Sequence, residues 1–197
     1  ADVVMLGRVG ETVLSGSSLA GQVQFVLTLF LFGLTSGAAV LTAQYWGKKD
    51  MRTIEKVMGI AFRFSIIVSV IFLLAVQIFP AQVMSIFTPE QPVIDEGVKY
   101  LRIVSFTYLL CAVTQVYLNV MRSVERVVIA TVTYSVSLIV NIVINGILIF
   151  GLLGFPRLGI VGAAIGTLIA RIVEVLIVVV YAKTKSILNF KLRDLFV

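Results

Sequence analysis

The sequence predicts an all-helical integral membrane protein, and three observations carry this prediction. Of the 197 residues, 59% are hydrophobic and only 13% are charged, and the mean hydropathy is +1.08. Soluble domains are closer to half apolar and a quarter charged. Apolar runs long enough to cross about 30 Å of hydrocarbon as helices recur along the chain. The basic residues lie between these runs, so the net charge of +6 does not indicate nucleic-acid binding.

The apolar runs define the expected helices. We expect five complete spans, at residues 17–43, 57–79, 98–121, 127–151 and 160–182. Ala1–Leu6 is also apolar and reads as the end of a further span, so we interpret the chain as a fragment that lacks most of its first helix. Residues 1–182 are therefore expected to form a six-helix bundle lobe with a truncated first helix. Residues 183–197 are expected to be a basic tail or linker.

The loops alternate in charge. Ten of the sixteen Lys and Arg residues fall in residues 42–56, 121–127 and 183–197. These three segments alternate with the other connections between the expected spans, so they should lie on the same side of the membrane. The longest loop of the opposite side, residues 80–97, contains three acids and no Lys or Arg. Because cytoplasmic loops are enriched in Lys and Arg, we place the tail in the cytoplasm and the acidic loop outside a plasma (inner) membrane.

The acidic loop contains Pro80, Pro89 and Pro92, which prevent one continuous helix through it. Its VMSIF stretch (residues 83–87) is compatible with a short amphipathic helix at the membrane surface or with a plain connection.

Small residues recur at a spacing that lets helices approach closely. Gly33 and Gly37 form one such pair, and Gly162 and Gly166 form another. In membranes this spacing is typical of packing seams between helices. The main alternative is a flexing point in a moving helix.

Side-chain amides occur in nearly every predicted span. Each could simply hold two helices together, but their recurrence favours a polar interior that faces water or a ligand. The candidates for lining such a cavity are Gln24, Gln115, Tyr108 and Tyr117. For either tyrosine, packing or lipid contact is the alternative.

Two groups of polar residues lie deep in the last two spans. Asn141 and Asn145 are four residues apart and share one helical face. Arg171 and Glu174 are three residues apart, within reach of an ion pair. The carboxylate is either part of a self-neutralising pair or responsive to protons or cations, since ionisable groups at this depth are costly unless paired.

The composition excludes several chemistries. There is no His, so an imidazole switch, a His-ligated metal and a Ser/His/Asp triad are all excluded within this chain. Cys111 is the single Cys, so neither an internal disulfide nor a Cys metal cluster is possible. No phosphate-binding Gly-rich loop with Lys and no catalytic pair of carboxylates is found. We therefore expect neither an enzyme, nor a metal centre, nor an organic cofactor.

Four segments resemble one family of transporters in the right order. They are DVVMLGRVG (Asp2–Gly10), AQYWGKKD (Ala43–Asp50), YLRI (Tyr100–Ile103) and NIVINGILIFGLLGFPRLGIVGAAIGTLIAR (Asn141–Arg171). Together they are similar to the first half of MATE (multidrug and toxic compound extrusion) transporters, and the similarity covers essentially the whole chain.

The resemblance implies a twelve-helix secondary transporter built from two six-helix lobes, a plan shared by other transporter families. It implies export of small cationic amphipathic compounds, antibiotics included, across the lipid bilayer in exchange for Na⁺ or H⁺. This chain would be the N-terminal lobe, and its partner would be the C-terminal lobe of the same protein.

The family's cation site can be carried over residue by residue. Its helix 1 acid corresponds to Asp2, its helix 5 Asn-x-x-x-Asp pattern to Asn141 and Asn145, and a helix 6 Thr to Thr167. The chain departs from the pattern at Asn145, where an amide that cannot carry a proton replaces the acid. Three interpretations remain open: a Na⁺ site with Asp2 as the one carboxylate, coupling through the other lobe, or hydrogen bonding without any cation.

Two other functions fit the sequence less well. A flippase for lipid-linked oligosaccharides is disfavoured because only Arg63 and Arg171 lie within the spans, whereas such relatives have Arg-rich cavities. A membrane scaffold without transport activity is disfavoured by the repeated amides inside the spans.

Overall fold

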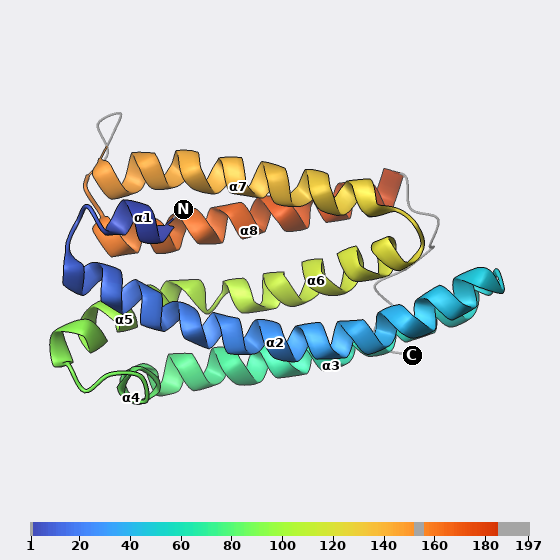
Figure 1. Cartoon of the computed structure of the whole chain (residues 1–197), viewed down its shortest axis with the longest axis horizontal. Coiled ribbons are helices and arrows are strands. Elements are labelled where there is room, and N and C mark those ends of the chain that lie inside the picture. Colours follow the sequence, from blue (N-terminus) through green and yellow to red (C-terminus); the bar gives the residue numbers. More distant parts are fainter. Residues whose placement is uncertain (1, 152–155, 185–197) are drawn as a thin grey trace.

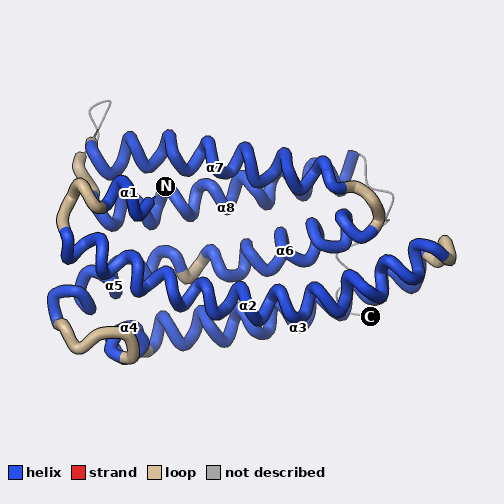
Figure 2. The backbone as a smooth tube through the Cα atoms, viewed as in Figure 1, coloured by secondary structure: helices blue, strands red, loops and turns tan. Residues whose placement is uncertain are grey.

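The computed structural model describes residues 2–151 and 156–184, with side chains from Val4 onward. Within these residues the chain is helical throughout, with short connections and no strand (Figure 2). The helices are α1 (Asp2–Leu6), α2 (Glu11–Gly47), α3 (Met51–Ile78), α4 (Pro80–Ser85), α5 (Gln91–Val104), α6 (Thr107–Ser123), α7 (Val127–Phe150) and α8 (Gly159–Thr184).

The predicted spans are present. Among the described residues, α2, α3, α7 and α8 are each long and apolar enough to cross a membrane, and α5 with α6 makes a fifth span that is bent by 53°. This last span differs from the single helix expected at 98–121, because it begins at Gln91 and is broken. Pro92 lies in the first turn of α5, where the missing N–H costs nothing, so this proline starts a helix rather than ending one.

The loop between α3 and α5 contains a short helix. Pro80 begins α4, a single six-residue segment, by the same rule that places Pro92 at the start of α5. Of the two interpretations of the VMSIF stretch, the structure places its first three residues in α4 and the remainder in the connection to α5.

The break between α5 and α6 contains neither proline nor glycine. The N–H of Phe106 donates to the carbonyl of Ile103 at 3.4 Å, one residue short of its α-helical acceptor. The carbonyl of Arg102, which an unbroken helix would pair with Phe106, is therefore left for side chains.

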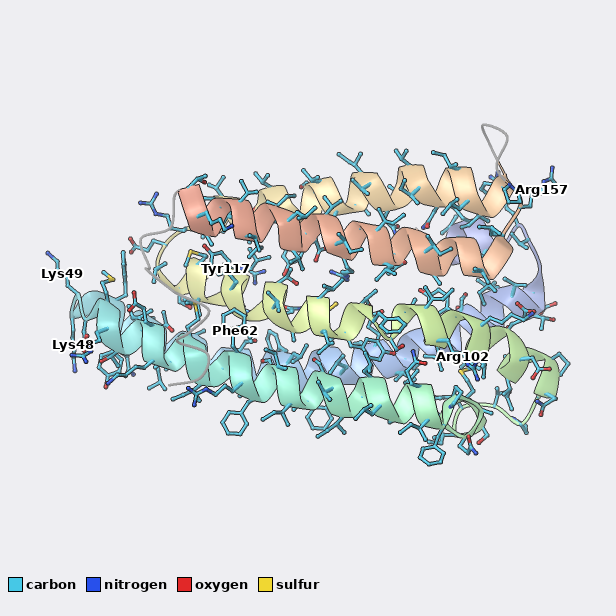
Figure 3. The ribbon with its side chains drawn as sticks, turned by 180° about the vertical axis from the view of Figure 1, so that it is seen from behind. Lys48, Lys49, Phe62, Arg102, Tyr117 and Arg157 are labelled. Atoms are coloured by element: carbon cyan, nitrogen blue, oxygen red, sulfur yellow. The ribbon has the colours of Figure 1, made fainter. Side chains whose placement is uncertain are left out.

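The ends of the bundle agree with the charge pattern. In Figure 1 the α2–α3 turn, the α6–α7 turn and the last turn of α8 lie at one end of the molecule, whereas the α1–α2 connection and the segment between α3 and α5 lie at the other. Lys48 and Lys49 are accordingly at the opposite end from Arg157 (Figure 3). The predicted basic tail falls largely on residues 185–197, outside the described residues.

The helices pack in layers. The α7–α8 pair, with α1 beside it, lies on one side; α2 and α3 lie on the other; and α5 and α6 run between them (Figure 1). Two apolar cores hold the layers together, one around α2, α5 and the start of α8, the other around α3 and α6. Large apolar side chains such as Phe32, Ile71 and Val128 are more than half exposed, which suits contact with lipid.

The two glycine pairs have different surroundings. A Cβ added at Gly162 would come within 2.8 Å of the backbone of Leu148, so this pair brings α8 against α7. A Cβ added at Gly33 or at Gly37 would meet nothing within 4 Å, so these two glycines do not form a packing seam within the described part of the lobe.

Candidate functional site

A polar cavity of about 740 Å³ lies among five helices. Its lining comes from α2 (Ser17, Ser18, Gly21, Gln22, Gln24), α5 (Tyr100), α6 (Gln115), α7 (Tyr134, Ser137, Leu138, Asn141) and α8 (Thr167, Ala170, Arg171, Glu174). Nearly every one of these side chains carries a polar atom or is small. A second hollow, of about 710 Å³ between the ends of α7 and α8, is lined mainly by aliphatic side chains.

Helical periodicity explains why these residues meet. On α7 the lining positions 134, 137, 138 and 141 follow the i, i+3, i+4, i+7 pattern of one helical face. On α8 the positions 167, 170, 171 and 174 do the same. Ser137 Oγ donates to the carbonyl of Ala170 at 3.5 Å, where the two faces meet.

Asn141, Asn145 and Thr167 form a hydrogen-bonded cluster, hereafter the amide cluster. Asn145 Nδ2 donates to Asn141 Oδ1 at 3.2 Å, and Asn141 Nδ2 donates to Thr167 Oγ1 at 3.4 Å. The structure therefore brings together the three positions that the family pattern selects on α7 and α8. Asn141 and Thr167 face the cavity, and Asn145 lies behind them with no exposed surface.

Gly166 makes room for Asn145. A Cβ built on Gly166 would overlap Asn145 Oδ1, so only glycine fits between this amide and the axis of α8. A buried amide costs free energy unless it is hydrogen-bonded, and Asn145 donates to Asn141 one turn earlier on the same helix. The glycine thus links the packing of α7 on α8 to the geometry of the amide cluster.

Asp2 begins α1, which packs against α2, α7 and α8. Figure 1 shows the start of α1 turned toward the middle of the bundle and its end turned toward the connection to α2. The side chain of Asp2 lies outside the described residues, so its relation to the amide cluster stays a prediction. The described members of the cluster are neutral: they supply oxygen atoms and no charge.

Arg171 and Glu174 are paired across the next turn of α8. Arg171 Nη1 donates to both carboxylate oxygens of Glu174, each at 2.8 Å. The Glu174 side chain is only 2% exposed, whereas that of Arg171 is 29% exposed and lines the cavity. The Glu174 carboxylate is buried against the guanidinium of Arg171, and both residues belong to the lining of the cavity.

The four cavity candidates separate into two pairs. Gln24 and Gln115 line the cavity, and Gln24 Nε2 lies 3.9 Å from Cys111 Sγ. Tyr108 and Tyr117 are instead buried, at 0% and 4% exposure.

The two tyrosines lie in the apolar cores for different reasons. Tyr108 shares a helical stripe with Gln115, but it lies just after the break, in the core that α6 shares with α2 and α5. Tyr117 is two residues from Gln115, which turns it to the other side of α6, toward the core with α3.

Sequence reasoning missed several lining residues. Tyr100, Tyr134 and the Ser17–Gly21 segment were not selected, although Tyr134, Ser137 and Asn141 are spaced as one helical face. That spacing was the available signal. Tyr100 had none: it reaches the cavity from α5, the first part of the bent span, which packs against α8.

An all-helical bundle with a polar cavity inside its apolar exterior is the architecture of a membrane transporter lobe. Residues 1–147 match the MatE family, and the chain belongs to this family. It is 28% identical over 82% of its length to the probable multidrug resistance protein YoeA of Bacillus subtilis, and 28% identical over 85% to the probable multidrug resistance protein NorM of Rhizobium meliloti.

Solved MATE structures share the fold. A crystal structure of MATE in the bent conformation aligns with 98% of the chain at a TM-score of 0.88 and 21% identity. An outward-facing multidrug resistance MATE family transporter aligns over the same share at a TM-score of 0.86. The chain spans 35% and 36% of the two curated relatives and 43% of each structure, so it corresponds to one lobe.

Proposed function

We propose that the chain is one lobe of a cation-coupled multidrug efflux transporter. The observation that carries the proposal is the polar cavity lined by five helices, since a lobe that only anchored or supported other proteins has no need of it. Family membership and the similarity to probable multidrug resistance proteins support export of drugs. The second lobe of the same transporter completes the pathway, so this lobe alone does not transport.

The substrates proposed are small cationic amphipathic compounds. A cavity of about 740 Å³ is within the range of drug-sized sites, roughly 300–1,000 Å³. Its carboxamide oxygens and the rings of Tyr100 and Tyr134 provide acceptors and aromatic faces for an organic cation. Alternating access between the two lobes then exposes the cavity to either side of the membrane.

The amide cluster favours Na⁺ over H⁺ as the ion coupled through this lobe. Neither Asn141 nor Asn145 can carry a proton, whereas amide and hydroxyl oxygens are suitable ligands for a hard cation. We propose that Asp2, Asn141, Asn145 and Thr167 together hold Na⁺, with Asp2 as the only charged ligand.

The orientation follows from the charges at the two ends of the bundle. The end with Lys48 and Lys49 is placed in the cytoplasm of a multi-pass protein of the plasma (inner) membrane, together with the C-terminal tail. The acidic segment between α4 and α5 is then external.

The test is efflux of ethidium, a cationic dye, from proteoliposomes that contain the complete two-lobe transporter. An imposed Na⁺ gradient should drive efflux, and a pH gradient alone should drive it less. Asp2→Asn should abolish the dependence on Na⁺. If neither gradient drives efflux, the transporter assignment is wrong; if Asp2→Asn leaves Na⁺-driven efflux unchanged, only the proposed ion site is wrong.

A further inference from the structure

The hollow of about 710 Å³ between the ends of α7 and α8 is an apolar groove with a polar mouth. Its floor contains Ile129, Ile177 and Tyr181, which belong to the core around α3 and α6 or pack against it. Its walls are aliphatic side chains that are 47% to 75% exposed: Val128, Val132, Leu176 and Val180. The groove is therefore anchored in the lobe and open at its surface.

The sequence of α8 explains why a groove lies at this end. Gly162 and Gly166 bring the first half of α8 against α7, since a Cβ at either position would collide with that helix. From Ile172 to Tyr181, by contrast, α8 contains neither Gly nor Ala. Larger side chains do not allow the same close approach of two helices, and the hollow opens between them.

The mouth of the groove carries one acid and one base. Glu125 and Arg126 reach it from the α6–α7 turn, and Thr184 reaches it from the last turn of α8. Backbone hydrogen bonds fix the turn: Glu125 N donates to the Arg122 carbonyl at 3.1 Å, and Arg126 N donates to the Met121 carbonyl at 2.8 Å. Because α7 and α8 are apolar spans that end here, the mouth lies at the level of the lipid headgroups.

Both charges at the mouth are available to a ligand. No described residue forms an ion pair with Glu125 or Arg126, and these two side chains do not pair with each other. An anionic headgroup would meet the Glu125 carboxylate, and a cationic one would meet the Arg126 guanidinium. A headgroup that carries one charge of each sign complements both.

The ethanolamine headgroup has the matching chemistry. Its phosphate suits a guanidinium, which donates two parallel N–H bonds to two phosphate oxygens. Its primary ammonium has N–H donors for the Glu125 carboxylate. The trimethylated ammonium of choline has no such donor, and glycerol carries no positive charge.

The groove provides the place for an acyl chain. Between Leu176 and Thr184 its wall on α8 extends over eight residues, a rise of about 12 Å. Lipid tails are as apolar as these side chains, so an acyl chain gains only packing by leaving the bilayer for the groove. Selection among lipids therefore rests on the headgroup.

We propose that the α7–α8 groove is a binding site for one phosphatidylethanolamine molecule, with the phosphate on Arg126 and the ammonium on Glu125. The site is separate from the polar cavity, and the lipid is a bound companion of the lobe rather than a transported substrate. Its test needs no transport measurement, so it stands apart from the proposed function.

The experiment is native mass spectrometry of the purified full-length transporter. Phosphatidylethanolamine, phosphatidylcholine and phosphatidylglycerol with identical acyl chains are added at equal concentrations, and the bound lipids are counted. We expect the wild-type protein to favour phosphatidylethanolamine over each of the others about five-fold, because ionic contacts at exposed positions contribute little.

Two substitutions at the mouth separate the roles of the charges. Glu125→Gln should bring the ethanolamine-to-choline ratio to within about two-fold of unity, and Arg126→Gln should weaken binding of all three lipids, since all carry a phosphate. Lys183→Gln is the matched control: Lys183 is in the last turn of α8 but does not line the groove, so the ratio should stay at the wild-type value.

A third pair of variants tests the groove itself. Val180→Trp fills it and should remove one bound phosphatidylethanolamine, whereas Ile71→Trp, on an equally exposed position of α3, should remove none. A melting transition in each variant shows that it is folded.

Three results would overturn the proposal. One is a wild-type protein that binds the three lipids equally or favours phosphatidylglycerol, the mark of general attraction to basic residues. Another is the same ratio in Glu125→Gln as in Lys183→Gln. The last is an unchanged lipid count in Val180→Trp, which would show that the groove is covered by another part of the transporter.

Discussion

Gln77 of α3 donates from Nε2 to the backbone carbonyl of Arg102 at 2.8 Å, where the helical hydrogen bonding between α5 and α6 is interrupted. The same nitrogen donates to Ser105 Oγ at 2.8 Å, and Ser105 Oγ in turn donates to the Arg102 carbonyl at 3.1 Å. Arg102 is seen at this position in Figure 3. A polar side chain from a neighbouring span thus satisfies the backbone group that the break releases.

Gln77→Leu should destabilise the protein modestly. The Arg102 carbonyl keeps its bond from Ser105, so the expected loss is about 1 kcal/mol, in line with single hydrogen bonds between membrane helices. Thermal unfolding in detergent measures it. Gln44→Leu is the matched control, because Gln44 is exposed on α2 and should leave the melting temperature unchanged. Equal melting temperatures for the two variants would contradict a structural role for the Gln77 bond.

Gly166→Ala should separate α8 from α7. The new methyl group would overlap Asn145 Oδ1, and overpacking of this kind costs about 1–3 kcal/mol. Gly146→Ala is the control on the facing helix: its Cβ meets nothing within 4 Å, and the higher helix propensity of alanine should keep stability equal or raise it. Melting temperatures decide the comparison, and ethidium efflux should fall in Gly166→Ala alone.

The two single substitutions at the Arg171–Glu174 ion pair should lower the free energy of unfolding by different amounts. Arg171→Met leaves the nearly buried Glu174 carboxylate without its partner, which should cost about 3 kcal/mol. Glu174→Gln leaves a cation that can draw water from the cavity, so its cost should be smaller, about 1 kcal/mol. The double variant should recover most of the loss in a double-mutant cycle of unfolding free energies. An additive cycle would show that the pair is not coupled.

Asn145→Asp should change the ion dependence of transport. It places a group that can carry a proton at the one position where this chain departs from the family's Asn-x-x-x-Asp pattern. We expect efflux in proteoliposomes to gain a dependence on the pH gradient of at least several-fold, whereas Asn145→Gln should not. The measurement is the ratio of H⁺-driven to Na⁺-driven ethidium efflux. A ratio unaffected by Asn145→Asp would show that coupling does not pass through this cluster.

Asp50 should make the stability of the first turn of α3 depend on acid. Its carboxylate caps the helix, accepting from Thr53 N at 3.1 Å and from Thr53 Oγ1 at 2.6 Å, and these bonds lower its pKa from 3.8. The pKa of Asp50 is lower in the folded state than in the unfolded state. The stabilisation is therefore complete above the unfolded-state pKa and is lost as the pH falls through the folded-state pKa. Asp50→Asn should therefore remove part of the decline in melting temperature below about pH 4. The control is Asp95→Asn, on an exposed position of α5.

Some features could be predicted from the residues in order. The number of spans, their alternation and the charged ends follow from apolar runs and from Lys and Arg counts, because lipid forces each run to satisfy its own backbone hydrogen bonds. The pairing of Arg171 with Glu174 and of Asn141 with Asn145 follows from spacing within one helix. The prolines interrupt the helix between α3 and α5 as predicted, but the following span begins at Gln91 rather than at residue 98, because proline is also well suited to the first turn of a helix.

The sequence by itself determined that this protein is a membrane bundle, which family it resembles, and that an amide stands at the expected acid position. Only the tertiary structure decided which helices line the cavity, that Tyr108 and Tyr117 lie in apolar cores, and that Arg171 and Glu174 both belong to the cavity lining. The physical reason is that helical periodicity fixes which residues share a face, whereas contact between faces depends on close packing and on a bend that no proline or glycine marks.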